Sequence, residues 1–204
     1  NFEKSLYSIN KGLWGTSVGG KETLSSKGML PEEAWPTQVT KTGTEEVKLG
    51  FEKGELKTVN DQAFSHPTEA IQFLQNIAGP YGIGRDIHVG DTIIGIKGRV
   101  GFEAAAPMLI LKGHHALEKH VLTKWQLQWK DQLASFYGNW LHEGQILDPV
   151  MRDIEAFLAN SQQNVTGDVF IQLFPYRFQV IGIESKYDLM NSKFGKYGEM
   201  NTGF

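Results

Sequence analysis

The chain has 204 residues, with 20 Lys and Arg against 23 Asp and Glu, which gives a formal net charge of −3. This near balance disfavours a dedicated nucleic-acid-binding protein, which usually carries a basic surface. The absence of Cys excludes disulfides and Cys-ligated metal centres. No apolar stretch approaches the roughly 18–20 residues of a membrane-spanning helix, and no signal peptide is recognisable.

The first 44 residues predict a loop-rich segment. Residues 5–30 are rich in Ser, Gly, Thr and Lys and indicate a loop with one short helix or strand, and residues 31–44 indicate a connection. The stretch 15–22 approaches a nucleotide-binding phosphate loop, but that loop requires Ser or Thr after its Lys, and Glu22 stands there. A phosphate-binding loop is therefore not expected here.

Strands and one helix are predicted between residues 45 and 103. Alternating apolar residues from Glu45, followed by Lys53-Gly54, predict a hairpin. Pro67 begins a helical pattern of apolar residues for which Gly79 supplies the end. Six glycines among β-branched residues over 82–102 indicate two or three short strands.

The second half of the chain predicts three helices and a hairpin. A helix is expected over 104–122, and its apolar run 108–111 implies deep burial. Thr123 and Gln126 fit a capping box that begins the next helix. Asp148 is a candidate N-cap for the last helix, which is expected to end near Ser161. Alternation over 165–184 around Pro175-Tyr176 predicts a second hairpin.

Together these elements predict the α+β class, with antiparallel hairpins packed against about four helices in a single domain. We divide the chain into a loop-rich segment (1–44), a main domain (45–185) and a C-terminal arm (186–204) without a core pattern.

Two clusters allow more than one interpretation. His114, His115, Glu118 and His120 lie close in sequence but match no zinc-protease pattern, which favours structurally bonded or solvated histidines. A group of aromatic residues recurs at helical spacing in surroundings that are not basic overall: Trp125, Trp129, Phe136, Tyr137 and Trp140. Such spacing favours a core or an oligomer interface over a base-stacking platform.

Several stretches resemble the C-terminal half of the argininosuccinate synthase family. They are YGIGR at 81–85, IGIKGR at 94–99, FEA at 102–104, SINKGLWGTS at 8–17, SQQNVTG at 161–167 and IESKYDL at 183–189. They follow the family's order over nearly the whole chain. The family's ATP-binding loop belongs to the other, N-terminal half.

The resemblance implies a cytoplasmic ligase of arginine biosynthesis that joins citrulline and aspartate with ATP and magnesium. ATP would be bound mainly by the N-terminal half, so the 204 residues alone are expected not to turn over. The full-length protein is expected to be a homo-oligomer, a tetramer in the family, with the second half contributing part of the citrulline pocket and most of the subunit contacts.

Residue by residue, the resemblance places citrulline-binding hydroxyls at Ser8 and Ser17, which keep the family's spacing of nine. A hydroxyl suits this role because it both donates and accepts hydrogen bonds. Two positions depart from the family, since its Glu is replaced by Gly90 and its Tyr by Phe102. Asp91 either supplies the missing carboxylate or forms part of a hairpin turn.

The loss of the carboxylate at Gly90 leads to a hypothesis about the substrate. A carboxylate in an amino-acid pocket pairs with the α-ammonium, whereas an acylated nitrogen carries no charge. The pocket is thus expected to accept citrulline or an N-acyl citrulline. The alternative is a non-catalytic interaction module that has kept the fold and lost its ligands.

Overall fold

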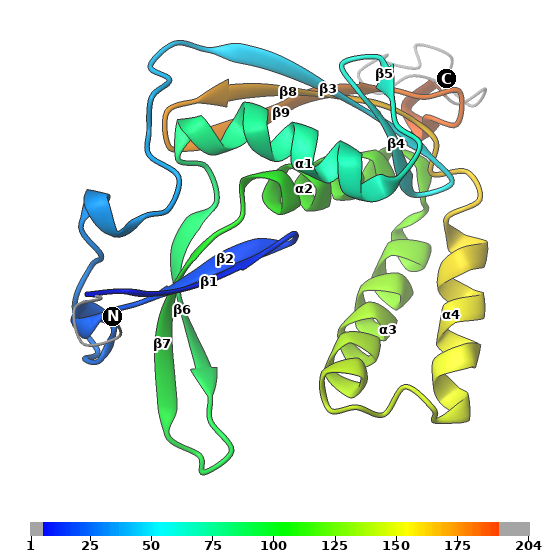
Figure 1. Cartoon of the computed structure of the whole chain (residues 1–204). Helices are drawn as coiled ribbons and strands as arrows, with labels where there is room; N and C mark the ends of the chain where they lie inside the picture. The colour runs from blue at the N-terminus through cyan, green and yellow to red at the C-terminus, as the bar shows by residue number, and fades with distance from the viewer. Residues whose placement is uncertain (1–5, 192–204) are drawn as a thin grey trace, which may run out of the picture.

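The computed structural model describes residues 6–191, and its strands form two separate antiparallel sheets (Figure 1). The small sheet has the order β1-β2-β7-β6 and the large sheet β5-β4-β3-β8-β9. The strands are β1 (Ser8–Gly12), β2 (Gly15–Gly19), β3 (Glu45–Glu52), β4 (Glu55–Val59), β5 (Gln62–Ala63), β6 (Arg85–Asp91), β7 (Lys97–Glu103), β8 (Gly167–Phe174) and β9 (Arg177–Glu184). The α-helices are α1 (Pro67–Ala78), α2 (Ala105–Val121), α3 (Lys124–His142) and α4 (Pro149–Ser161). The predicted α+β class is confirmed for the described residues.

The main core lies between the large sheet and helices α1 and α2, which cover one face of it (Figure 1). Val47 and Leu49 of β3 and Val169 of β8 are fully buried, as their alternation predicts. Leu74 of α1 and Leu109 of α2 meet them from the helical layer and are also fully buried. Burial of such side chains contributes about 1.5–3 kcal/mol each.

The prediction of a loop over residues 5–30 is wrong for its middle part. Strands β1 and β2 form a tight hairpin, and β2 continues the small sheet by pairing with β7. Every residue of β1 is exposed. The strand therefore lacks the alternation of apolar and polar residues from which a strand is predicted. Strand β7, with which β2 pairs, is also distant in sequence, so no local sequence pattern predicts this pairing.

Helix α1 ends at Ala78 with Gly79 as its C-cap, so the predicted end of the helix is confirmed. Gly79 keeps a right-handed conformation, and a short 3-10 helix (Gly79–Tyr81) continues the chain. The reversal comes at Gly82, whose φ of 71° lies in the left-handed region that favours glycine. Gly79 therefore ends the α-helix, and Gly82 ends the 3-10 turn that follows it.

Helices α3 and α4 form an antiparallel pair that projects from the body (Figure 1). The predicted capping box is confirmed, since Thr123 and Gln126 exchange hydrogen bonds of 2.9 and 3.4 Å. Tyr137 of α3 donates a 2.7 Å hydrogen bond to Glu155 of α4. No residue of α3 is buried, so the core interpretation of its aromatic residues is wrong.

Four aromatic residues of α3 form a line along the helix, which we call the aromatic stripe: the exposed Trp125, Trp129 and Phe136, and the partly buried Trp140. Trp125 is 63% exposed and Trp129 is 57% exposed. Phe136 and Trp140 stack with their ring centroids 5.1 Å apart. The stripe therefore remains a candidate for the interface interpretation.

The apolar run at the start of α2 is less buried than predicted. Leu109 faces the core, but Met108 is only partly buried and Leu111 is 54% exposed. The helix turns one side of this run away from the large sheet, because residues one turn apart share a face and their immediate neighbours do not.

The C-terminal arm predicted for 186–204 is described only as far as residue 191. Over this part Tyr187 packs against the main core. Asp188 lies 3.1 Å from His120 of α2, and Ser185 donates a 2.6 Å hydrogen bond to the carbonyl of Thr166. The first residues of this segment are thus attached to the domain, and the rest of the predicted arm lies outside the described residues.

Candidate functional site

Four of the five predicted substrate-binding residues share one face of the small sheet. Ser17 lies directly opposite Phe102 of β7, and Phe102 lies opposite Asp86 of β6. Ser8 lies opposite Gly19, two residues from Ser17 on the same face of β2. Because side chains alternate along a strand, His88 and Gly90 also belong to this face. We call it the open face.

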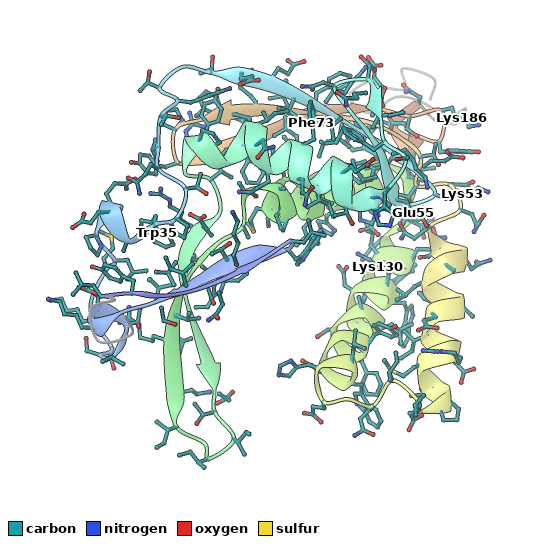
Figure 2. All side chains as sticks on the ribbon, viewed as in Figure 1. Trp35, Lys53, Glu55, Phe73, Lys130 and Lys186 are labelled. Atoms are coloured by element: carbon teal, nitrogen blue, oxygen red, sulfur yellow. The ribbon has the colours of Figure 1, made fainter. Side chains whose placement is uncertain are left out.

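The opposite face of the small sheet is covered by the chain that follows β2. Val18 packs there with Leu30, Ala34 and Trp35 in a second core cluster. Figure 2 labels Trp35 in this segment, beside the small sheet. This covering segment leaves a hollow of about 480 Å³ beside Val89 and Arg99, whereas the strands of the open face have no such segment packed over them.

Two arginines that match family positions are used to hold this covering segment. The Arg85 guanidinium donates to both carboxylate oxygens of Glu32, at 2.9 and 2.8 Å, and lies over the Trp35 ring. Arg99 donates to the carbonyls of Ser25 and Gly28. Both side chains are thus occupied by structural contacts rather than pointing to the open face.

The Phe102 ring forms the centre of the open face. It meets the ring of His88 edge to face, with centroids 5.4 Å apart. It also covers Gly15 of β2, where an added Cβ would collide with the ring and where φ is 145°. Glycine is therefore required at position 15, and the ring is held between two strands.

Asp91 is not brought to the open face. It follows Gly90 by one residue, so its side chain points to the other side, where it forms an exposed ion pair with Lys97. Thr92 bonds to Ile96 through both its backbone N–H and its hydroxyl. Asp91 is thus the last residue of β6, opposite Lys97, and the turn begins at Thr92, while the Asp91 side chain lies on the face of the sheet opposite to Ser8 and Ser17.

A cavity of about 490 Å³ adjoins the open face. Its walls come from the open face, the start of α2 and the turn between β8 and β9. A larger hollow of about 850 Å³ lies along the large sheet near Phe51 and Glu184, and none of the predicted substrate-binding residues lines it. We place the candidate site at the open face because the predicted ligands gather there.

The histidine cluster has structural partners in the described structure. His114 bonds to Gln162 at 2.9 Å, and the buried Glu118 carboxylate accepts from Lys130 at 2.7 Å and from Gln162 at 2.8 Å. His115 lies 3.4 Å from the same carboxylate. Across residues 6–191, no group of three or more His, Asp or Glu side chains is arranged to hold a metal ion. This network joins α2, α3 and α4.

Burial of the imidazole lowers the pKa of His114, and the nearby Glu118 carboxylate opposes this only in part. Below about pH 6.5 the unfolded chain then binds a proton at His114 more readily than the folded chain. We expect the free energy of unfolding to fall as the pH drops below this value. His114→Gln should flatten that part of the curve, measured by urea unfolding between pH 5 and 8. An unchanged pH slope in the variant would contradict the assignment.

Comparison with known proteins identifies the family. The family described as "Arginosuccinate synthase C-terminal domain" matches residues 7–203. The chain belongs to the argininosuccinate synthase family. It is 35% identical to the argininosuccinate synthase of Methanocaldococcus jannaschii, with 97% of this chain and 50% of the relative covered. The enzymes of Dictyoglomus thermophilum and Xanthomonas campestris are 34% and 33% identical, with 98% and 97% of this chain and 50% of each relative covered.

The chain thus spans about half the length of the curated argininosuccinate synthases that it matches. Within residues 6–191, none of the helices combines the length and apolar character that a bilayer crossing requires. The stretch 15–22 that approaches a phosphate loop lies in β2 and the short 3-10 helix Lys21–Thr23.

Sequence reasoning missed one member of the candidate site. Trp14, in the turn between β1 and β2, lines the cavity and is 47% exposed. A hairpin assignment for residues 8–19 would have placed Trp14 in its turn. His88, which the sequence places close to Asp91, lies between Asp86 and Gly90 on the open face and contacts Phe102.

Proposed function

We propose that the chain is the C-terminal, synthetase part of an argininosuccinate synthase. The full-length protein would ligate citrulline and aspartate to argininosuccinate, with release of AMP and pyrophosphate, in arginine biosynthesis in the cytoplasm. The observation that carries the proposal is the convergence of Ser8 and Ser17 on the open face of a family member. ATP, with magnesium, would be bound mainly by the half that this chain does not include.

The chemistry explains what the open face has to do. A ureido carbon is a poor electrophile, so the ureido oxygen first attacks the α-phosphorus of ATP and pyrophosphate leaves. The amine of aspartate then attacks the activated carbon, and AMP leaves. The hydroxyls of Ser8 and Ser17 would orient citrulline by hydrogen bonds, and closure against the nucleotide-binding half would exclude water.

Mass spectrometry of the full-length protein with citrulline, aspartate and Mg-ATP tests this proposal. We expect argininosuccinate, AMP and pyrophosphate in equal amounts. The alternative is an interaction module that has lost its ligands, for which Phe102 and Gly90 are the supporting features. Calorimetry with citrulline and a non-hydrolysable ATP analogue separates the two. Absence of both turnover and binding would establish the module.

The aromatic stripe supports a homo-oligomer, for which a tetramer is proposed. Gln128, Gln132 and Asn139 beside the stripe are uncharged, and the Lys124 ammonium lies over the Trp125 ring at one end of it. Interface centres are enriched in aromatic residues and depleted of charge. We therefore propose that α3 contacts a second copy of the chain.

We expect the double substitution Trp125→Glu and Trp129→Glu to dissociate the full-length oligomer, because it would bury charges without partners. The measurement is molar mass by light scattering after gel filtration. Leu147→Glu, at an exposed position beyond the stripe, is the control and should keep the parent mass. A double variant with the parent mass and unchanged circular dichroism would place the subunit contact elsewhere.

A further inference from the structure

The cavity beside the open face is lined mainly by apolar side chains. Phe102 and His88 form one wall, and Met108 and Leu111 of α2 face them. Phe178 of β9 also lines the cavity, together with the charged residues Asp86 and Arg177. A cavity of about 490 Å³ falls within the range of small-molecule sites, which combine apolar walls with a few polar groups.

This cavity explains why the apolar run of α2 is only partly buried. Leu111 is 54% exposed and Trp14, across the cavity, is 47% exposed. Single exposed apolar residues need no explanation, whereas several that converge on one hollow mark a binding site. The surface therefore fits an apolar group of a ligand.

A second observation lies further along β6. Gly90 and Gly98 are opposite each other in the β6–β7 pair and leave a patch of the open face without side chains. Neither glycine has a positive φ. A Cβ on Gly90 would meet nothing within 4 Å, and one on Gly98 only the Thr92 methyl at 3.8 Å. Glycine within a strand, where the fold does not need it, indicates close approach by a ligand.

The bare patch and the cavity are connected along one strand. Asp86, His88 and Gly90 occupy successive positions on the open face of β6, about 7 Å apart. Asp86 and His88 line the cavity and Gly90 lies just beyond it. A group that starts over Gly90 and runs across His88 thus reaches the apolar walls.

The charges beside Gly90 indicate what kind of nitrogen lies there. The neighbouring Asp91 points to the other face and pairs with Lys97. The carboxylate of the open face in β6 belongs to Asp86, about 13 Å further along the strand. An α-ammonium at Gly90 therefore has no carboxylate from β6 within hydrogen-bond reach, whereas an uncharged amide needs none.

We infer that the citrulline substrate carries an apolar acyl group on its α-nitrogen, with the amide over Gly90 and Gly98 and the acyl chain in the cavity between Phe102, Met108 and Leu111. This inference rests on the proposed ligase function. The acyl group is a recognition element and takes no part in the bond changes. It adds apolar burial that free citrulline lacks, and so favours the acylated substrate.

The test compares kcat/KM of the full-length enzyme for citrulline and for N-acetyl, N-butyryl and N-hexanoyl citrulline, with aspartate and Mg-ATP. We expect at least a tenfold preference for the acylated substrates and an increase from acetyl to hexanoyl. A tenfold or greater preference for free citrulline would overturn the inference while leaving the ligase function intact.

Met108→Trp tests the position of the acyl chain, because the larger side chain occupies the cavity. We expect the ratio of kcat/KM for hexanoyl over acetyl substrate to fall at least tenfold. Leu147→Trp, at a site 92% exposed in the connection before α4, is the matched control and should keep the parent ratio. An unchanged ratio in a folded Met108→Trp enzyme would exclude this cavity as the acyl site.

Calorimetry keeps the inference separate from catalysis. If no citrulline derivative is turned over, the proposed ligase function is wrong. The relative affinities for citrulline and N-hexanoyl citrulline still show whether the cavity binds an acyl group. Full-length protein that binds N-hexanoyl citrulline at least tenfold more tightly than citrulline supports the site. Equal binding of both, or a cavity filled by another part of the full-length protein in a crystal structure, refutes it.

Discussion

Lys130→Met is expected to lower the free energy of unfolding by about 3–5 kcal/mol, the range for breaking one side of a buried ion pair. Glu118 is fully buried, and within residues 6–191 Lys130 is its only cationic partner whose charge does not depend on histidine protonation. Figure 2 places Lys130 at the end of α3 nearest the body. Loss of the ammonium leaves a buried carboxylate without its counter-charge.

Urea unfolding, followed by tryptophan fluorescence and circular dichroism, measures this loss. Lys112→Met, at an exposed position of α2, is the control and should change stability by less than about 0.5 kcal/mol. Combining Lys130→Met with Glu118→Gln should restore most of the stability, because the buried charge is removed as well. A Lys130→Met variant as stable as the parent would show that water or His115 replaces the lysine.

Ser17→Ala is expected to lower kcat/KM of the full-length enzyme for its citrulline substrate by about 10–100-fold, the equivalent of one hydrogen bond to a polar ligand. Ser8→Ala should act similarly, because both hydroxyls lie on the open face. Their effect on folding should be small, since Ser8 is exposed and Ser17 is only partly buried.

Steady-state kinetics of each variant, with the unfolding midpoint measured in parallel, checks this expectation. Ser26→Ala is the matched control, because Ser26 is an exposed serine of the same N-terminal region outside the small sheet. Its kcat/KM should equal that of the parent. Parent-like activity in both Ser8→Ala and Ser17→Ala would remove the open face from citrulline recognition.

The large sheet could be predicted from the sequence because one face of each central strand is buried. Val47 and Leu49 of β3, like Val169 and Ile171 of β8, are buried and alternate with partly buried residues, a pattern that predicts their strands. The N-cap Asp148, whose carboxylate accepts from the backbone of Val150 at 2.9 Å, likewise marks the start of α4. Local physics determines each of these elements.

Family resemblance names residues of the candidate site, but the strand pairing that brings them together could not be predicted from the sequence. Family resemblance points to Ser8 and Ser17, yet the strand that holds them pairs with β7, far along the chain. The open face is polar and glycine-rich because it is not filled by the protein's own core. A strand whose face is left uncovered for a ligand has few apolar residues on that face. Such a strand therefore lacks the apolar alternation from which strands are predicted.

The order of strands in the large sheet has a consequence for synthesis on the ribosome. Strand β3 lies between β4 and β8, and Leu49 pairs with Val169. A nascent chain that has not yet reached β8 therefore presents β3 as an unpaired strand edge. Such edges bind other strands readily. Ribosome-bound intermediates that end before Gly167 should therefore depend on chaperones, and that dependence should cease once β9 has emerged.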